Sequence, residues 1–202
     1  MKQDHPGVPV VTYVNTSAAV KAESDVCCTS ANALQVVEAL GSERVIFLPD
    51  GYLARWVASQ SEVEIIGWEG RCEVHERFTA REIEEYRDLQ PGICVIAHPE
   101  CPPDVLEIAD YVGSTSQMAH HLERARPEKA VLITECSMSD NLAADFPDID
   151  FVRPCNLCPH MKLITLEKIL TALREMRFQV EIPTEILARA RQSVERMLIL
   201  TG

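Results

Sequence analysis

Short apolar runs alternate with helix-like patterns along the chain, and this order returns about 85 residues later. The expected strands are residues 8–14, 44–48, 63–68, 93–97, 130–134 and 149–152. A shift of 85 residues lays residues 45–48 on residues 130–133 and Asp50 on Glu135, and a shift of 86 lays Cys72 on Cys158. Strands that alternate with helices favour parallel sheets covered by helices. We therefore expect an α/β fold of two repeated, three-stranded parallel lobes.

The repeat divides the chain into one lobe at residues 1–90, a second lobe at residues 91–162, and a helical C-terminal segment at residues 163–202. The expected helices are residues 32–40, 51–59, 79–89, 103–109, 116–125, 165–176 and 183–200. Thr79 is the expected N-cap of the third of these helices. A short strand is expected at residues 179–182, between the last two helices.

The charge and hydrophobicity of the chain exclude several classes of partner. The formal net charge is −12, whereas binding to nucleic acid requires a basic surface and binding to anionic lipid requires basic clusters. We therefore expect neither nucleic acid nor a membrane as a partner. No run of about 18 apolar residues exists to span a bilayer, and the N-terminus lacks an apolar signal region. These features predict a cytoplasmic protein.

Polar side chains lie where the strands are expected to end, which is where parallel α/β sheets bind ligands. Tyr13 and Asn15 follow the first strand, and His98 and Glu100 follow the strand at residues 93–97. Three small hydroxyl residues precede helices at equivalent places in the two lobes: Ser30, Ser114 and Thr115. Hydroxyls at helix N-termini cap free N–H groups, and those N–H groups also attract anions. Capping alone would explain either segment, but two equivalent segments indicate a phosphate or carboxylate bound between the lobes.

Eight cysteines are many for a cytoplasmic chain, in which cysteines serve as metal ligands, catalytic groups or small core residues. The core interpretation suits Cys27, Cys28, Cys94 and Cys136, whereas Cys101 lies beside the candidate site.

Two cysteine motifs point to a metal. Cys72 precedes His75 by three residues, and Cys155 and Cys158 form a CxxC motif that could hold zinc, exchange disulfides or ligate a cluster. The repeat favours Cys158 over Cys155 as the partner of Cys72. Two thiolates are fewer than the roughly four ligands that a cluster takes. Extending the repeat backwards places a third cysteine before Met1, so we expect a first lobe that this chain lacks.

Several longer motifs resemble the quinolinate synthase family, in the order of that family from about residue 8 to residue 200. They are VVTYVNTSA at residues 10–18, SDVCCTS at 24–30, FLPD at 47–50, WEGRCEVH at 68–75, HPEC at 98–101, ADYVGSTS at 109–116, CPHMK at 158–162 and RML at 196–198. The family consists of three similar α/β lobes around a pseudo-threefold axis, with the active site at the centre. By this resemblance, residues 163–202 would pack on the absent first lobe.

The resemblance implies a transferase of NAD biosynthesis that condenses iminoaspartate with dihydroxyacetone phosphate to quinolinate. It implies a [4Fe–4S] cluster with Cys72 and Cys158 as ligands and one iron free to act as a Lewis acid. Glu100 would be the proton shuttle, with Tyr13 and His98 as further catalytic groups. The implied substrate-binding residues are Tyr13, Asn15, Ser30, His75, His98, Glu100, Ser114 and Thr115.

The implied partners are the two substrates, L-aspartate oxidase by a functional link, and a missing N-terminal lobe or a dimer partner. A truncated or split enzyme fits the same resemblance and would expose apolar surface that favours self-association. Two other readings stay open. One is a non-catalytic zinc-binding module that uses Cys72, Cys155 and Cys158 with His75 or His160. The other is an anion-binding module that uses Ser30 and residues 114–116.

Overall fold

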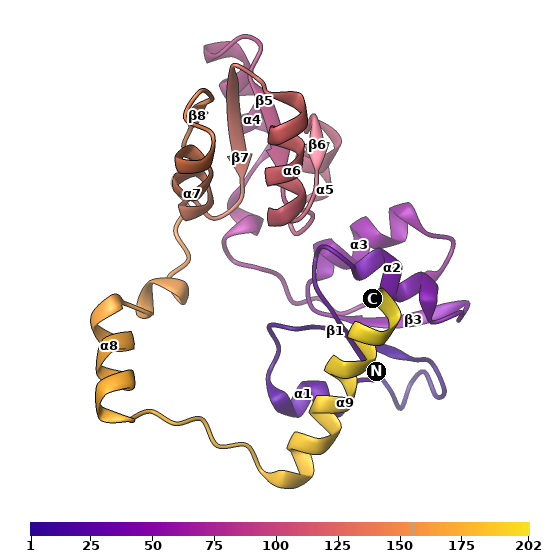
Figure 1. Cartoon of the computed structure of the whole chain (residues 1–202). Helices are drawn as coiled ribbons and strands as arrows, with labels where there is room; N and C mark the ends of the chain where they lie inside the picture. The colour runs from indigo at the N-terminus through magenta and orange to yellow at the C-terminus, as the bar shows by residue number, and fades with distance from the viewer. Residues whose placement is uncertain (155) are drawn as a thin grey trace.

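The chain forms two α/β lobes, each built on a four-stranded parallel sheet, in a computed structural model that describes residues 1–154 and 156–202 (Figure 1). The first sheet has the order β2-β1-β3-β4. Its strands are β1 (Val10–Tyr13), β2 (Val26–Cys28), β3 (Arg44–Leu48) and β4 (Glu64–Gly67). The second sheet has the equivalent order β6-β5-β7-β8. Its strands are β5 (Cys94–Ala97), β6 (Tyr111–Val112), β7 (Lys129–Ile133) and β8 (Asp150–Val152).

The predicted parallel α/β lobes are confirmed, but each sheet has four strands where the sequence predicted three. The two missed strands, β2 and β6, are three and two residues long. They are therefore shorter than the apolar run of about four to eight residues that marks a strand. The aspartate before each short strand bonds to the neighbouring strand of its sheet. Asp25 Oδ2, before β2, accepts the Val10 N–H of β1 at 2.8 Å, and Asp110 Oδ2, before β6, accepts the Val95 N–H of β5 at 2.7 Å. The repeat thus extends to individual hydrogen bonds.

Most of the described helices lie close to the predicted positions. The helices are α1 (Ala18–Ala22), α2 (Ala33–Ala39), α3 (Gly51–Gln60), α4 (Ala80–Leu89), α5 (Pro103–Glu107), α6 (Thr115–Ala125), α7 (Ser137–Asp145), α8 (Leu166–Glu175) and α9 (Thr184–Thr201). Thr79 caps α4 as predicted, in a capping box with Glu82. The helices α1 and α7 were not predicted, because α1 is only five residues long and α7 mixes polar with small residues. The strand predicted at residues 179–182 is wrong: residues 179–181 are exposed and pair with no described strand.

The apolar cores lie between the sheets and their helices. In the first lobe, Phe47 and Val11 from the sheet pack with Leu53 and Val57 of α3. The second lobe has one apolar cluster around Ile83, Val95 and Val131 and another around Ile96, Met118 and Leu132. Buried strands between helix layers leave only the strand ends open to polar groups, so these ends are where a site can form.

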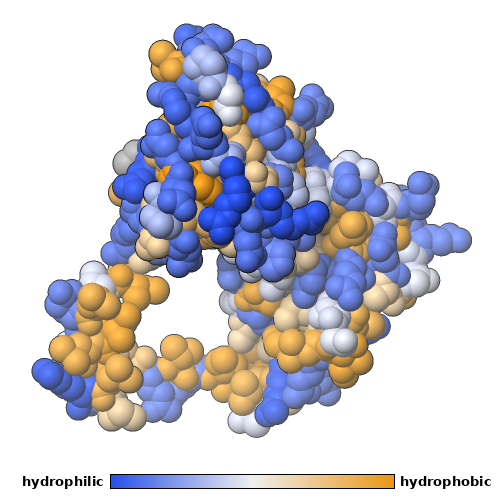
Figure 2. All heavy atoms as spheres, turned by 45° about the horizontal axis from the view of Figure 1, so that its top comes forward, coloured by the Kyte–Doolittle hydropathy of each residue, from blue (hydrophilic) through white to orange (hydrophobic). Residues whose placement is uncertain are grey.

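The two C-terminal helices differ in how they pack. α9 lies along α1, α2 and β2 of the first lobe, where Cys27 Sγ lies 3.3 Å from Ser193 Oγ and Met197 enters the apolar core (Figure 1). α8 stands apart from both sheets and has no buried residue, and its apolar side chains are exposed (Figure 2). The packing of residues 163–202 on a further lobe stays a prediction. Within the described part of the chain, no helix combines the length and the apolar character needed to cross a membrane.

Candidate active site

The two lobes meet at the carboxyl ends of their strands, through Ser30 and His98. Ser30 follows β2 and His98 follows β5, and both residues are buried. The Ser30 Oγ atom lies 3.2 Å from His98 Nε2. The Glu100 backbone N–H donates to His98 Nδ1 at 3.3 Å, so the ring proton belongs on Nε2, where it can be donated to Ser30. The structure therefore brings together two predicted site residues from different lobes.

His75 joins this pair from the segment that connects the lobes. It begins a 3₁₀ turn, His75–Arg77, and its ring stacks on the His98 ring with centroids 4.6 Å apart and planes 17° apart. His75 Nε2 lies 2.9 Å from the Thr134 hydroxyl. His75 Nδ1 lies 3.1 Å from Glu100 Oε2, within ion-pair distance but without the geometry of a hydrogen bond. Thr134, which follows β7, was missed by the sequence analysis.

Glu100 is the central carboxylate of the cluster and is 6% exposed. Burial raises the pKa of Glu100, but the contacts with His75, His98 and Tyr13 outweigh it and leave the pKa below its ordinary value. Burial and then the Glu100 charge raise the pKa of Tyr13, whose hydroxyl also contacts Ser30. At neutral pH the cluster thus contains an ionised carboxylate beside a neutral phenol.

The two histidines hold different charges, which their surroundings explain. Burial lowers the pKa of His75, but the contacts with Cys72 and Glu100 outweigh burial and raise the pKa to about 9. Burial and then the charge of His75 lower the pKa of His98 to about 4. The stacked rings are therefore one imidazolium and one neutral imidazole at pH 7, so proton donors and acceptors lie side by side.

A metal could bind beside this cluster. Within the described residues, one ligand atom from each of Cys72, His75 and Glu100 lies within 4.8 Å of the other two. Thiolate and neutral imidazole are ligands for zinc and iron centres, so the donors fit a metal cofactor once His75 releases its proton. Cys158 is not in this group, but the loop that carries it is close: His160 Nε2 lies 3.0 Å from Glu73 Oε1. Cys155 of the CxxC motif lies outside the described residues.

Three predicted anion-binding residues are less engaged with this cluster. Asn15 and Thr115 are exposed, and none of the described hydrogen bonds joins either side chain to the cluster. Ser114 is buried, and its hydroxyl accepts the Gln117 N–H in the capping box of α6. For Ser114 the geometry shows capping, and anion binding by these three residues stays a prediction.

Most of the remaining cysteines lie in the apolar cores. Cys27, Cys28 and Cys101 are fully buried, and burial raises the pKa of each thiol. Cys94 and Cys136, which the sequence assigned to the core, are only partly buried. None of these five thiols belongs to the group of candidate metal ligands in the described part of the chain.

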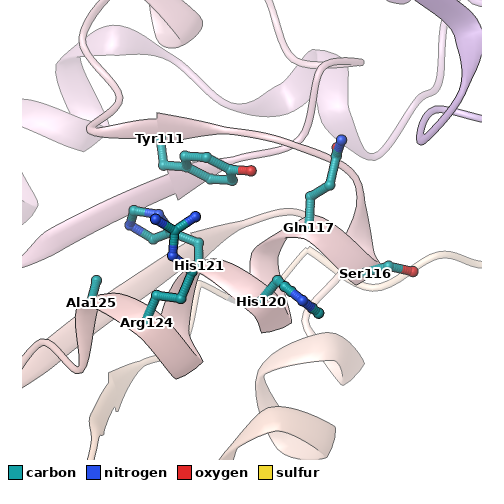
Figure 3. Close-up of a pocket in the computed structure, with 7 residues that line it drawn as sticks. All are labelled: Tyr111, Ser116, Gln117, His120, His121, Arg124 and Ala125. Carbon is teal, nitrogen blue, oxygen red and sulfur yellow. The ribbon is translucent and has the colours of Figure 1, made fainter. Parts of the chain in front are cut away.

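A separate hollow lies between β6 and α6 (Figure 3). The rings of Tyr111 and His121 stack within it, with centroids 4.1 Å apart, and Arg124 lies beside them. It shares no residue with the cluster around Glu100. The hollow is therefore a distinct surface feature rather than part of the candidate active site.

Comparison with known proteins agrees with the motifs. A family model described as quinolinate synthetase A protein matches residues 1–199. The chain is 64% identical over 200 residues to quinolinate synthase 1 of Mesorhizobium japonicum, an alignment that covers 99% of this chain and 62% of that protein. It is 60% identical over 198 residues to a quinolinate synthase of Agrobacterium fabrum, with 98% and 57% covered, and 57% identical over 200 residues to one of Xylella fastidiosa, with 99% and 59% covered. The chain thus spans about 60% of the length of these curated relatives. The match confirms the resemblance drawn from the motifs, and the chain belongs to the quinolinate synthetase A protein family.

Proposed function

We propose that this chain forms two lobes of a cytoplasmic quinolinate synthase, a transferase that condenses iminoaspartate with dihydroxyacetone phosphate in NAD biosynthesis. Membership of the family supports the reaction. The observation that carries the proposal is the cluster of His75, His98 and Glu100, which assembles between the lobes beside Cys72. Iminoaspartate is unstable in water, so an oxidase that acts on L-aspartate is the natural supplier of this substrate.

The side chains of the cluster suit the proton transfers of this condensation. Glu100 is buried and ionised and contacts both His75 and Tyr13, so it can accept a proton from substrate and pass it to a neighbour. Tyr13 keeps its proton and can donate a hydrogen bond. His75 carries a positive charge that favours substrate carboxylate or phosphate. Ser30, Asn15, Ser114 and Thr115 would supply further polar contacts to the anionic groups.

The proposed cofactor is a [4Fe–4S] cluster, with Cys72 and Cys158 as two of its ligands. The donors fit because each lobe offers one partly exposed cysteine after its last strand, and the Glu73–His160 contact holds the two loops near each other. Two thiolates do not complete the roughly four ligands that a cluster takes, so residues outside this chain would supply the rest. When bound, the cluster would supply a Lewis acid at an iron without a protein ligand.

Anaerobic reconstitution with iron and sulfide tests the cofactor directly. We expect the wild-type chain, with a small thiol such as dithiothreitol present to complete the ligand set, to bind both elements and to develop the broad brown absorbance of thiolate-bound iron. Cys72→Ser and Cys158→Ser should each lower the bound iron by at least about half, because each removes one of few ligands. Cys94→Ser is the matched control, since Cys94 is also partly exposed but lies outside the candidate metal group. Equal iron in all four proteins, or a colourless chain that holds only zinc, would contradict the proposal.

A further inference from the structure

Each lobe places a carboxylate two residues beyond its third strand in chain order, and this carboxylate accepts the backbone N–H of a cysteine. Asp50 follows β3, and its Oδ2 accepts the Cys72 N–H at 2.6 Å. Glu135 follows β7, and its Oε1 accepts the Cys158 N–H at 3.3 Å. The bonds span 22 and 23 residues of sequence. Each cysteine loop is therefore tied to the end of a central strand of its own lobe.

The same carboxylates also hold the start of the next helix. Asp50 Oδ1 accepts the N–H groups of Tyr52 and Leu53 at 2.7 and 3.0 Å, and so caps α3. Glu135 Oε2 accepts the Ser137 N–H at 2.9 Å at the start of α7. Strand end, helix start and cysteine loop thus meet at one side chain in each lobe.

Capping alone does not account for a buried carboxylate at this place. Elsewhere in the chain, Thr79 and Ser114 cap α4 and α6 with a single hydroxyl oxygen. Asp50 is only 4% exposed, and a charged carboxylate at a buried position is costly unless it is hydrogen-bonded. The second carboxylate oxygen of Asp50 accepts the Cys72 N–H, and that of Glu135 accepts the Cys158 N–H together with the Ser137 hydroxyl at 3.3 Å.

We infer that Asp50 and Glu135 are positioning residues that fix the backbone of Cys72 and Cys158, and with it the direction of each thiol. The inference rests on the proposed function for the role of the two cysteines as ligands. The arrangement of the two carboxylates and their bonds is a property of the chain itself. A ligand held by its own peptide group keeps its direction before metal arrives, which reduces the ordering needed on binding.

Two amide substitutions isolate the cysteine contacts. Asp50→Asn keeps one acceptor oxygen, and asparagine caps helices as well as aspartate does, so the cap of α3 should survive. The new amide group then faces the Cys72 N–H as a second donor. Glu135→Gln makes the same change at Cys158. Asp25→Asn and Asp110→Asn are the matched controls, because these carboxylates accept strand N–H groups in the same lobes but make no hydrogen bond to Cys72 or Cys158.

The readout is the rate at which iodoacetamide alkylates each cysteine of the full chain without metal, followed by peptide mass spectrometry. We expect Asp50→Asn to speed alkylation of Cys72 about tenfold and Glu135→Gln to do the same for Cys158, since each loses a charge-assisted hydrogen bond. Each change should act only in its own lobe, and the control variants should leave both rates within about twofold of wild type.

Cobalt(II) provides a second measurement at Cys72, His75 and Glu100, because a thiolate ligand gives cobalt a characteristic charge-transfer absorbance. We expect Asp50→Asn to weaken cobalt binding about tenfold and Asp25→Asn to leave it unchanged. Unchanged alkylation in both amide variants would overturn the inference, as would equal acceleration by the controls. A wild-type chain that takes up no iron and sulfide would instead overturn the proposed cofactor, while the alkylation rates would still decide the positioning role.

Discussion

The contact between Ser30 and His98 predicts a measurable energetic link between the two lobes. Both residues are buried, at 9% and 4% exposure, and their side-chain atoms lie 3.2 Å apart. Because the pKa of His98 is lowered to about 4, the ring is neutral at pH 7 and the bond joins two uncharged groups. Ser30→Ala removes the acceptor and leaves the ring N–H buried without a partner.

The expected cost follows from the burial of both groups. A neutral hydrogen bond contributes about 0.5–1.5 kcal/mol, and a buried donor left unsatisfied costs about 1–3 kcal/mol. We therefore expect Ser30→Ala to lower the free energy of unfolding by about 2 kcal/mol. In a chain of this size, each kcal/mol corresponds to about 2–4 °C in melting temperature. The variant should melt about 4–8 °C below wild type.

Urea unfolding of a double-mutant cycle isolates the bond from the loss of the hydroxyl itself. Ser30→Ala, His98→Phe and the double variant should give a coupling energy of about 1–2 kcal/mol. Thr115→Ala is the control, because Thr115 occupies the equivalent place in the second lobe but is exposed. The control should change stability by less than about 0.5 kcal/mol. A coupling energy below about 0.3 kcal/mol would show that this contact does not join the lobes.

Four further outcomes follow from the same structure. Thr134→Val removes the hydroxyl 2.9 Å from His75 Nε2 and should lower the unfolding free energy by about 1–3 kcal/mol in urea. Under the proposed function, Glu100→Gln should slow quinolinate formation about 10²–10⁴-fold, while the melting temperature changes little. The pKa of His98, which faces His75 and Glu100, is about 4 when folded and 6.5 ordinarily, so the unfolded chain takes up more protons between these values. Wild type should lose more melting temperature than His98→Phe as the pH falls from 6.5 to 4. Leu173→Glu on the exposed face of α8 should reduce self-association in sedimentation velocity runs.

The fold was predictable where strands were long enough to leave an apolar run. The five-residue strand β3 lies at the predicted residues and β7 begins and ends one residue before the prediction, and the internal repeat correctly paired them. β2 and β6 could not be found in this way, because two or three residues give no periodicity. The exposure of α8 could not be predicted either, since its strongly apolar face is typical of a helix that packs against a protein core.

The site was predictable from polar residues at strand ends. Tyr13, His98 and Glu100 stood out at the ends of apolar runs, and Ser30 stood out as a hydroxyl residue before a predicted helix. The structure gathers all four. Thr134 did not stand out, because a threonine after a buried strand resembles one more strand residue. Its equivalent in the first lobe, 85 residues earlier, is a proline, so the repeat gave no signal for it.

The two lobes share the hydrogen bonds that position the site but differ in the ionisable side chains that form it. Bonds made by side chains to the backbone recur in both lobes: an aspartate on the N–H of the first strand, and a carboxylate on the N–H of the cysteine. The ionisable side chains of the central cluster diverge between the lobes, since Tyr13 corresponds to His98 and Asn15 to Glu100. If both lobes had kept the same ionisable group, two like charges would face each other between the lobes and raise the cost of burying either. Divergence at these positions instead places a phenol, a neutral imidazole and an imidazolium around one carboxylate. The residues that recur in both lobes are therefore the positioning residues. The residues that differ between the lobes are the groups that can move protons.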